Sequence, residues 1–315
     1  MLTGLLAGLA AGALWGLTFV APNLVAPFTP FDLAFWRNLI FAALSLGLLL
    51  AFRAAARRLD PAGWRIALAL GLMGYSGYYL FVAYAVAFAG PAIPALVIGA
   101  LPVLLAIAGN WQSRDVAWSR LAGPLALITL GLVIVNLGSL RAPVMGRTGG
   151  EILLGFVLSL GGLALWLWYG LWNAAALKAR PGTDTLVWTS LQGLGAGLGM
   201  LAVLPFGLAM GWSRMGALPL AGAEALPLWL WALATGLFSS WVATFAWVVA
   251  SRRLSVALSA QLIVSETLFG LFYGFLAETR WPDWHEGLGA ALLFAGVMAG
   301  IRVLMPPAEP EPSPA

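Results

Sequence analysis

Long stretches without a charged residue constrain this chain more than any other feature. They cover 1–31, 38–52, 66–113, 121–140, 152–177, 185–213 and 225–251. A helix needs about 20 mostly apolar residues to cross the hydrocarbon core of a bilayer. Within lipid, only helices and closed barrels satisfy their own backbone hydrogen bonds. These runs therefore predict an all-α polytopic membrane protein.

The composition excludes several other classes of protein. The 315 residues are 62% hydrophobic and 9% charged, whereas a soluble domain is about 45–50% apolar and about 25% charged. The chain has no cysteine, which excludes disulfides, thiolate catalysis and cysteine-ligated metals. Its single histidine, His285, cannot form a histidine cluster. We therefore expect neither a metal nor another cofactor.

The positive charge of the chain is better explained by membrane orientation than by nucleic-acid binding. The sequence pI is near 9.8, but the sixteen Lys and Arg residues are scattered between apolar runs and form no basic patch or nucleic-acid motif. The N-terminus has no basic segment before its first apolar run. We therefore interpret 2–22 as a first membrane span and not as a cleaved signal.

Ten spans account for the apolar runs. The 48 residues of 66–113 must hold two spans, and the prolines of "AGPAIP" (89–94) mark the break between them. The predicted spans are 2–22, 33–52, 64–88, 91–111, 119–139, 152–177, 185–206, 225–250, 254–276 and 285–304. The tail 306–315 is acidic and proline-rich, which predicts a disordered cytoplasmic segment.

The distribution of basic residues predicts the orientation of the spans. With the N-terminus inside, eleven of the sixteen Lys and Arg residues fall in cytoplasmic segments, chiefly "RAAARRLD" (53–60) and "SRR" (251–253). An excess of positive charge marks the cytoplasmic side. Ten spans return the chain to the side where it began, so both termini are expected in the cytoplasm.

Two sequence echoes suggest that the chain consists of two related halves. "LAAGALW" (9–15) resembles "LGGLALW" (160–166), and Trp118 and Gly123 match Trp284 and Gly289. The halves are 1–140 and 150–305, with five spans each. Because five is odd, the second half enters the membrane from the opposite side, as in the inverted repeats of many secondary transporters. The alternative is that apolar segments resemble each other through composition alone.

Several short motifs, in this order, resemble one known family. They are "ALWGLTFVAPNLV" (13–25), "LAFWRNLIFAALSL" (33–46), "ALPVLLAIAGN" (100–110) and "SETLFGLFYGFLAETRWPDWHEGLGAALLFAGVMAG" (265–300). Together they resemble the EamA-type transporters of the drug/metabolite transporter superfamily. The resemblance covers nearly the whole chain. One departure is Thr267, which stands where the family usually has a proline after the span-nine glutamate, so a hinge there is in doubt.

The resemblance carries its own expectations about architecture and function. It implies a ten-helix transporter of a bacterial inner (plasma) membrane, in which spans one, three, four, six, eight and nine surround a cavity. Spans five and ten would support the fold or a homodimer contact. Members of the superfamily commonly export amino acids or other metabolites, which is an argument by family analogy.

A stripe of glycines in the first span predicts close helix packing. Gly4, Gly8, Gly12 and Gly16 recur at every fourth residue, so they lie on one face of a helix. A face without side chains lets a second backbone approach closely.

Aromatic and polar residues deep inside predicted spans are the candidates for a substrate cavity. They are Trp15, Tyr75, Tyr78, Tyr79, Trp166, Tyr169, Asn173, Trp241 and Ser259. Trp172 and Trp247 are ambiguous in depth, whereas Trp188 and other tryptophans near span ends fit the interfacial aromatic belt. Aromatic walls with a few polar groups are typical of pockets for small organic solutes. The alternative is that these rings only pack between helices.

Glu266 is the only carboxylate well inside a predicted span. An acid within the membrane is expensive and usually functional. Three interpretations remain open: proton coupling, contact with a substrate amine, or a neutral glutamate that is hydrogen-bonded to a neighbouring helix. Arg37 lies a few residues inside the second span and could extend to the outer surface. We interpret it as structural or as a weak attraction for anions.

These features favour a secondary transporter that works by alternating access, and specifically an exporter of amino acids or related organic solutes. Transport of another solute class, such as a drug-like cation, a purine or a sugar derivative, is the alternative, followed by a channel or a membrane enzyme. No H-E-x-x-H, G-x-S-x-G or P-loop motif occurs, so we expect no enzyme and no direct use of ATP. The expected partners are a small-molecule substrate and the lipid bilayer, with proton coupling and a homodimer left open.

Overall fold

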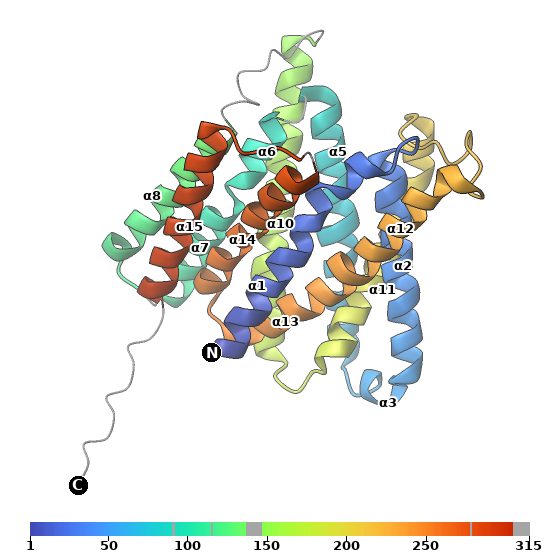
Figure 1. The fold of residues 1–315 in the computed structure, drawn as a ribbon. Helices are drawn as coiled ribbons and strands as arrows, with labels where there is room; N and C mark the ends of the chain where they lie inside the picture. The colour runs from blue at the N-terminus through green and yellow to red at the C-terminus, as the bar shows by residue number, and fades with distance from the viewer. Residues whose placement is uncertain (90–91, 115, 137–146, 278, 305–315) are drawn as a thin grey trace.

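The computed structural model describes residues 1–89, 92–114, 116–136, 147–277 and 279–304. Within these ranges the chain is helical and contains no β-strand. Figure 1 shows a bundle in which α15 ends on the side where α1 begins. We call this the lower side, and the side where α2 begins the upper side. The predicted disordered tail, 306–315, lies outside the described residues.

Ten helices of the described chain are long and apolar enough to cross a membrane, as the sequence predicted. Six of them are single α-helices, and two more carry only short breaks. The ten spans are α1 with η1 (Leu2–Gly16, Leu17–Phe19), α2 (Pro30–Ala51), α4 with η3 and α5 (Pro61–Gly71, Leu72–Gly77, Tyr78–Ala89), α6 with α7 (Ala92–Gly99, Leu101–Ser113), α8 (Trp118–Val135), α10 (Gly149–Ala179), α11 (Thr185–Ala209), α12 with η5 and α13 (Leu226–Ala234, Thr235–Val242, Ala243–Arg253), α14 (Val256–Ala277) and α15 (Trp284–Leu304).

Short polar motifs begin several of these helices. Thr29 and Asp32 form a capping box at the start of α2, and Thr148 and Glu151 form another at the start of α10. Asp184 accepts hydrogen bonds from the first backbone N–H groups of α11. Each cap satisfies donors that the helix itself leaves without partners. The caps therefore define where the apolar runs begin to be helical.

The first span is shorter than predicted, because α1 ends at Gly16 and η1 ends at Phe19. The Thr18 hydroxyl donates to the Trp15 carbonyl at 2.6 Å. Pro22 follows in the short helix η2 (Ala21–Leu24), and a proline cannot donate the backbone hydrogen bond that a continuing helix needs. The span expected to reach residue 22 therefore stops about one turn earlier.

The third and eighth spans each contain a π-helical segment near their middle. These segments are η3 and η5, and both interrupt an otherwise regular α-helix. π-Helical turns are rare in proteins, but those that occur often lie at functional sites. The two spans occupy the same place in the two halves of the chain. Tyr75 lies in η3 and Trp241 lies in η5.

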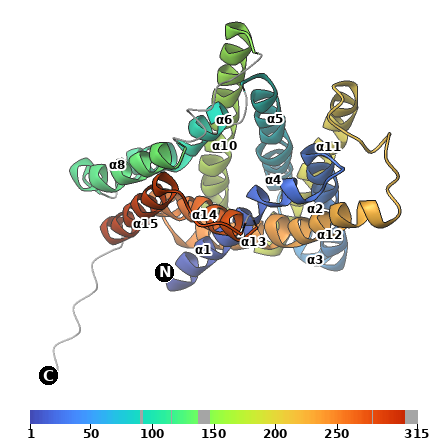
Figure 2. The ribbon, with the colours of Figure 1, turned by 45° about the horizontal axis from the view of Figure 1, so that its top comes forward.

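The helix contacts match between the two halves. Helix α1 packs against α13 and α14, whereas its counterpart α10 packs against α5, α6 and α7. Three further pairs join helices five spans apart: α2 with α11, α7 with α14, and α8 with α15. Helix α11 also packs against α4 and η3, and α2 against η5. Figure 2 shows α8 and α15 together at one end of the molecule and α2, α11 and α12 at the other. This pattern is consistent with a duplicated unit, and the inverted repeat stays a prediction.

The glycine stripe of α1 lies against α14 and the connection before it. Gly4 faces Leu254, Gly8 faces Leu262, and Gly12 faces Ser265. At Gly16 a Cβ atom would lie 2.9 Å from the backbone nitrogen of Gly270. Real Cβ atoms do not approach that closely, so this contact requires a glycine. The stripe brings α1 and α14 together at the level of the aromatic core.

Candidate functional site

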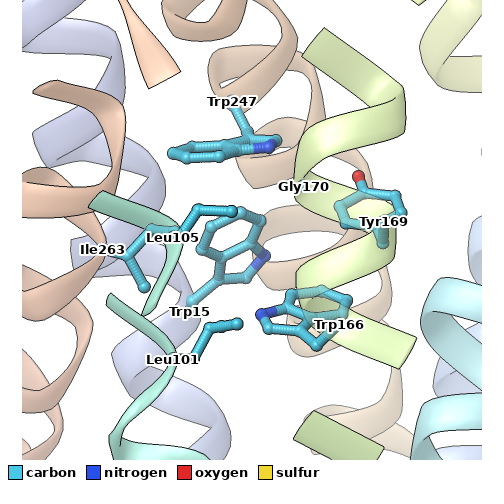
Figure 3. Close-up of a pocket in the computed structure, with 8 residues that line it drawn as sticks. All are labelled: Trp15, Leu101, Leu105, Trp166, Tyr169, Gly170, Trp247 and Ile263. Carbon is cyan, nitrogen blue, oxygen red and sulfur yellow. The ribbon is translucent and has the colours of Figure 1, made fainter. Parts of the chain in front are cut away.

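An aromatic cluster lies at the centre of the bundle, where several helices of both halves meet. The ring of Trp15 on α1 lies 6.5 Å from that of Trp166 on α10 and 5.6 Å from that of Trp247 on α13. Trp166 and Tyr169 stack with their centroids 4.8 Å apart. Figure 3 shows these rings around one small space, with the indole nitrogen of Trp166 turned toward Trp15. The cluster therefore joins three spans through their largest side chains.

A cavity of about 10 Å³ lies within this cluster. It is lined by Trp15, Leu101, Leu105, Trp166, Tyr169, Gly170, Trp247 and Ile263. This volume is about what one water molecule needs, whereas ligand pockets usually measure about 300–1,000 Å³. The first three lining residues belong to the first half and the others to the second. The cavity is thus too small for an organic solute in this structure, and its walls come from both halves of the chain.

A second cavity of about 10 Å³ lies next to the first, toward the lower side. It is lined by Leu105, Gly170, Ala174, Trp247, Ser251, Val256 and Ser259. Among the described residues, the Ser259 hydroxyl and the Trp247 indole nitrogen are buried without a hydrogen-bond partner. Buried polar groups normally have a partner. These two groups can therefore hydrogen-bond a solute or a water molecule.

The two cavities leave Trp241 and Asn173 outside their walls, although both were predicted to line the substrate cavity. Trp241 stacks on Phe245 with ring centroids 5.4 Å apart. Asn173 faces α11, where its Oδ1 accepts from Trp188 Nε1 at 2.9 Å and from Gln192 Nε2 at 3.2 Å. Asn173 lies on the same helix as Trp166 and Tyr169, but its side chain points toward α11. It therefore links α10 to α11, which both belong to the second half.

Trp188 differs from its predicted place in the interfacial belt, because it is fully buried. It lies one turn inside α11, and its indole N–H is satisfied by Asn173. Tyr169 also reaches α11, since its hydroxyl donates to Gln192 Oε1 at 2.8 Å. The Tyr169 ring is therefore held in the cavity wall by a hydrogen bond outside the cavity.

The tyrosines of the third span divide between two neighbours. Tyr78 stacks on Trp166 at 4.9 Å, and Tyr75 lies 6.0 Å from the same indole. The Tyr75 hydroxyl is hydrogen-bonded to Thr244 of α13. Tyr79 instead packs against Phe31 of α2, 6.3 Å away. Tyr78 and Tyr79 face different neighbours because adjacent helical residues point about 100° apart.

Glu266 lies on α14 one turn above Ile263, which lines the first cavity. Its side chain is half-buried. Within the described ranges, the Glu266 carboxylate forms no hydrogen bond and no ion pair. No partner residue is therefore found for a neutral glutamate hydrogen-bonded to a neighbouring helix. Ser259, Ile263 and Glu266 recur at spacings of four and three residues. They therefore form one face of α14 that runs along both cavities to the acid.

Arg37 was not among the residues predicted to line the cavity. It lies seven residues after Pro30, about 10 Å below the upper end of α2, and its Nε is buried without a hydrogen-bond partner in the described part of the chain. The guanidinium lies within electrostatic range of the Glu266 carboxylate. The Arg37 side chain as a whole is only half-buried, so its expected extension to the outer surface stays a prediction.

The acid nearest to Arg37 along α2 is already occupied. The Asp32 carboxylate accepts from the Thr29 backbone N–H at 2.9 Å, from the Ser213 hydroxyl at 2.7 Å and from the Arg214 backbone N–H at 3.1 Å. These bonds fix the start of α2 against the loop before α12. Arg37 and Glu266, which are both half-buried, are thus left without an ion-pair partner among the described residues.

Comparison with known proteins agrees with this architecture. Residues 2–137 match the EamA-like transporter family. The inner membrane protein YtfF of Escherichia coli (strain K12) is 32% identical over 315 residues, covering 96% of each chain. A crystal structure of another protein shows the same fold, with a TM-score of 0.75 and 20% identity over 96% of this chain and 97% of that one. The chain therefore belongs to the EamA-like transporters of the drug/metabolite transporter superfamily, a family of integral membrane transporters.

Proposed function

We propose that this protein is a secondary transporter that exports amino acids or related small organic solutes by alternating access. The observation that carries this proposal is the small aromatic cavity, whose walls come from both halves of the chain. In transporters built from paired repeats, the substrate site lies near the membrane midplane between the repeats. A movement of one half against the other would open this cavity to one side at a time.

The matched helix pairs suggest which parts move and which do not. Helices α8 and α15 pack mainly against each other at one end of the molecule, so they suit a supporting role or a homodimer contact. Helices α1, α7, α10, α13 and α14 carry the cavity walls. Opening requires these wall helices to separate, because the present cavities hold little more than one water molecule each.

The chemistry of the walls supports a small organic substrate with an apolar part. Tryptophan and tyrosine faces surround the first cavity, and the polar atoms of Trp247 and Ser259 face the cavities without partners. Such walls suit hydrophobic or aromatic amino acids. A drug-like cation, a purine or a sugar derivative is the second candidate, because an aromatic cage also binds cations.

Other parts of the proposal rest on the family and on the charge pattern. We place the protein in a bacterial inner membrane with both termini in the cytoplasm, because the positively charged connections lie on the lower side. We propose that the protein is not an enzyme. Glu266 is the candidate for proton coupling or for contact with a substrate amine.

Counterflow in proteoliposomes tests the proposed function. Vesicles that contain the purified protein are loaded with an unlabelled candidate solute, and uptake of the labelled solute is followed. A carrier predicts saturable uptake that the internal solute accelerates, for at least one member of a panel of amino acids, polyamines, purines and cationic dyes. Non-saturable flux would indicate a channel, and the absence of flux for every solute would contradict the proposal.

A further inference from the structure

The half-buried side chains of Arg37 and Glu266 have opposite charges and lie on helices of different halves. We infer that Arg37 and Glu266 form a two-point site for a zwitterion, in which Arg37 binds the carboxylate and Glu266 the ammonium group of an α-amino acid. This inference rests on the proposed transport function and names the groups that would select its substrate. Neither the family match nor the relative's name assigns this pair.

The first argument is the unfilled bonding capacity of Arg37. A guanidinium offers five N–H donors in a fixed fork that matches a carboxylate. The Nε of Arg37 is buried and lacks an acceptor in the described structure, and the Asp32 carboxylate is occupied by Thr29, Ser213 and Arg214. A buried donor without a partner is destabilising, so the site gains most from a ligand that brings an anion.

The second argument is the position of Glu266 relative to the cavity. Ile263 lines the first cavity, and Glu266 follows one turn later on the same face of α14. Tyr78, which stacks on Trp166, lies within electrostatic reach of Glu266. The carboxylate is therefore next to the aromatic wall, where the amine of a bound amino acid would lie if its side chain entered the cavity.

The third argument is that the two charges act on each other without forming a pair. Arg37 attracts Glu266 electrostatically, yet among the described residues the two side chains form neither an ion pair nor a hydrogen bond. The backbone of α2 at Arg37 lies against Gly236 of η5, and the backbone of α14 at Glu266 lies against Gly12 of α1. The helices that carry the charges are thus held by close backbone contacts, with the charged groups left separate.

A zwitterion is the ligand class that satisfies both groups at once. An amine without a carboxylate would leave Arg37 unpaired, and an acid without an amine would leave Glu266 unpaired. An unpaired charge in a low-dielectric interior is costly, so each lost partner should weaken binding strongly. The tryptophan cavity would take an apolar or aromatic side chain.

Ligand analogues test the inference on the unmodified full-length protein. The probes are phenylalanine, 2-phenylethylamine and 3-phenylpropionate, together with the corresponding leucine series, measured by thermal shift and by inhibition of counterflow. We expect each amino acid to bind about 10- to 100-fold more tightly than either analogue, as hydrogen bonds to charged groups imply. Equal affinity for an amino acid and one of its analogues would overturn the two-point site.

Two substitutions then assign each charge. Arg37→Gln should weaken amino acid binding about 10- to 100-fold and leave amine binding nearly unchanged, whereas Glu266→Gln should weaken amino acid binding and spare the acid. Arg37→Lys should keep part of the preference for a carboxylate. Arg65→Gln and Glu224→Gln are matched controls, because both side chains are exposed. A variant that weakens all three ligands equally would contradict the assignment.

These experiments separate failure of the inference from failure of the proposed function. If no solute of the counterflow panel is exchanged, the transport proposal fails. If amino acids are exchanged but Arg37→Gln retains the wild-type preference for a carboxylate, only the two-point site fails. If amines or dyes are exchanged and amino acids are not, the zwitterion site is overturned while carrier activity stands.

Discussion

Trp166 contacts aromatic rings from three spans: Trp15 of α1, Tyr75 and Tyr78 of the third span, and Tyr169 one turn further along α10. At the scale of single residues the sequence identified this group, since each was an aromatic residue deep in an apolar run. It did not identify Trp247 or Arg37. Depth in a span can be read from sequence, but the neighbour that a side chain faces depends on how the helices pack.

Replacement of Trp166 separates a cavity wall from a packing role. Trp166→Ala should raise the half-saturation concentration for counterflow at least about tenfold, because it removes an aromatic face from the cavity. Trp166→Phe should have a smaller effect. The control is Trp111→Ala, since Trp111 is 73% exposed. The half-saturation concentration of each variant is measured on the folded fraction after size-exclusion chromatography. An unchanged half-saturation concentration with a lower folded yield would assign Trp166 to packing alone.

At the scale of helices and loops, apolar length and caps predict the ten spans well. Each predicted span corresponds to one found in the structure, because the need to cross the bilayer is a local property of the sequence. The π-helical segments η3 and η5 were not predicted. Their wide turns carry no residue signature in this sequence, and they depend on the helices packed around them.

The approach of α1 to α14 gives a prediction about stability. Gly16→Ala should destabilise the protein by about 1–3 kcal/mol, because the new Cβ would lie 2.9 Å from the Gly270 backbone nitrogen. The control is Gly47→Ala on α2, where no atom lies within 4 Å of a new Cβ. Alanine is the better helix former, so that variant should be neutral or slightly stabilised. Thermal unfolding in detergent measures both. Equal midpoints for the two variants would contradict the close contact.

The loops of the lower side give a pH prediction. Asp60 caps α4 and forms an ion pair with Arg180 at 2.9 Å. Its hydrogen bond to Arg180 holds the pKa of Asp60 below its usual value. A lowered pKa means that the ionised form is favoured by folding. This contribution is therefore present above about pH 4, the pKa of an unfolded aspartate, and is lost as the pH falls through the lower folded value.

Removal of either partner should make the thermal stability of the protein depend less on pH in the acid range. Asp60→Asn and Arg180→Gln should each reduce the loss of thermal stability below about pH 4, and the double variant should add little to either. The effect at neutral pH should be small, because the pair is exposed to solvent. Thermal midpoints across the acid range provide the measurement. A wild-type slope in both single variants would show that the pair is not formed in solution.

At the scale of the whole molecule, two sets of five spans meet around small aromatic cavities, which should open to each side of the membrane in turn. The repeat was inferred from short echoes, and the matched helix pairs in the structure agree with it. The volume of the cavity in its open states could not be inferred from sequence, because it depends on how far the halves separate.

Alternating access can be tested by cysteine labelling, since the chain has no native cysteine. Gly182→Cys and Gly216→Cys are reference variants on exposed connections at the lower and upper sides, and each should react with a membrane-impermeant thiol reagent from its own side alone. Ser259→Cys lies in the second cavity wall. We expect this cysteine to react slowly from either side. A transported solute added inside should change its reaction rate in the opposite direction to the same solute added outside. Reaction from one side only, whatever the solute, would contradict alternating access.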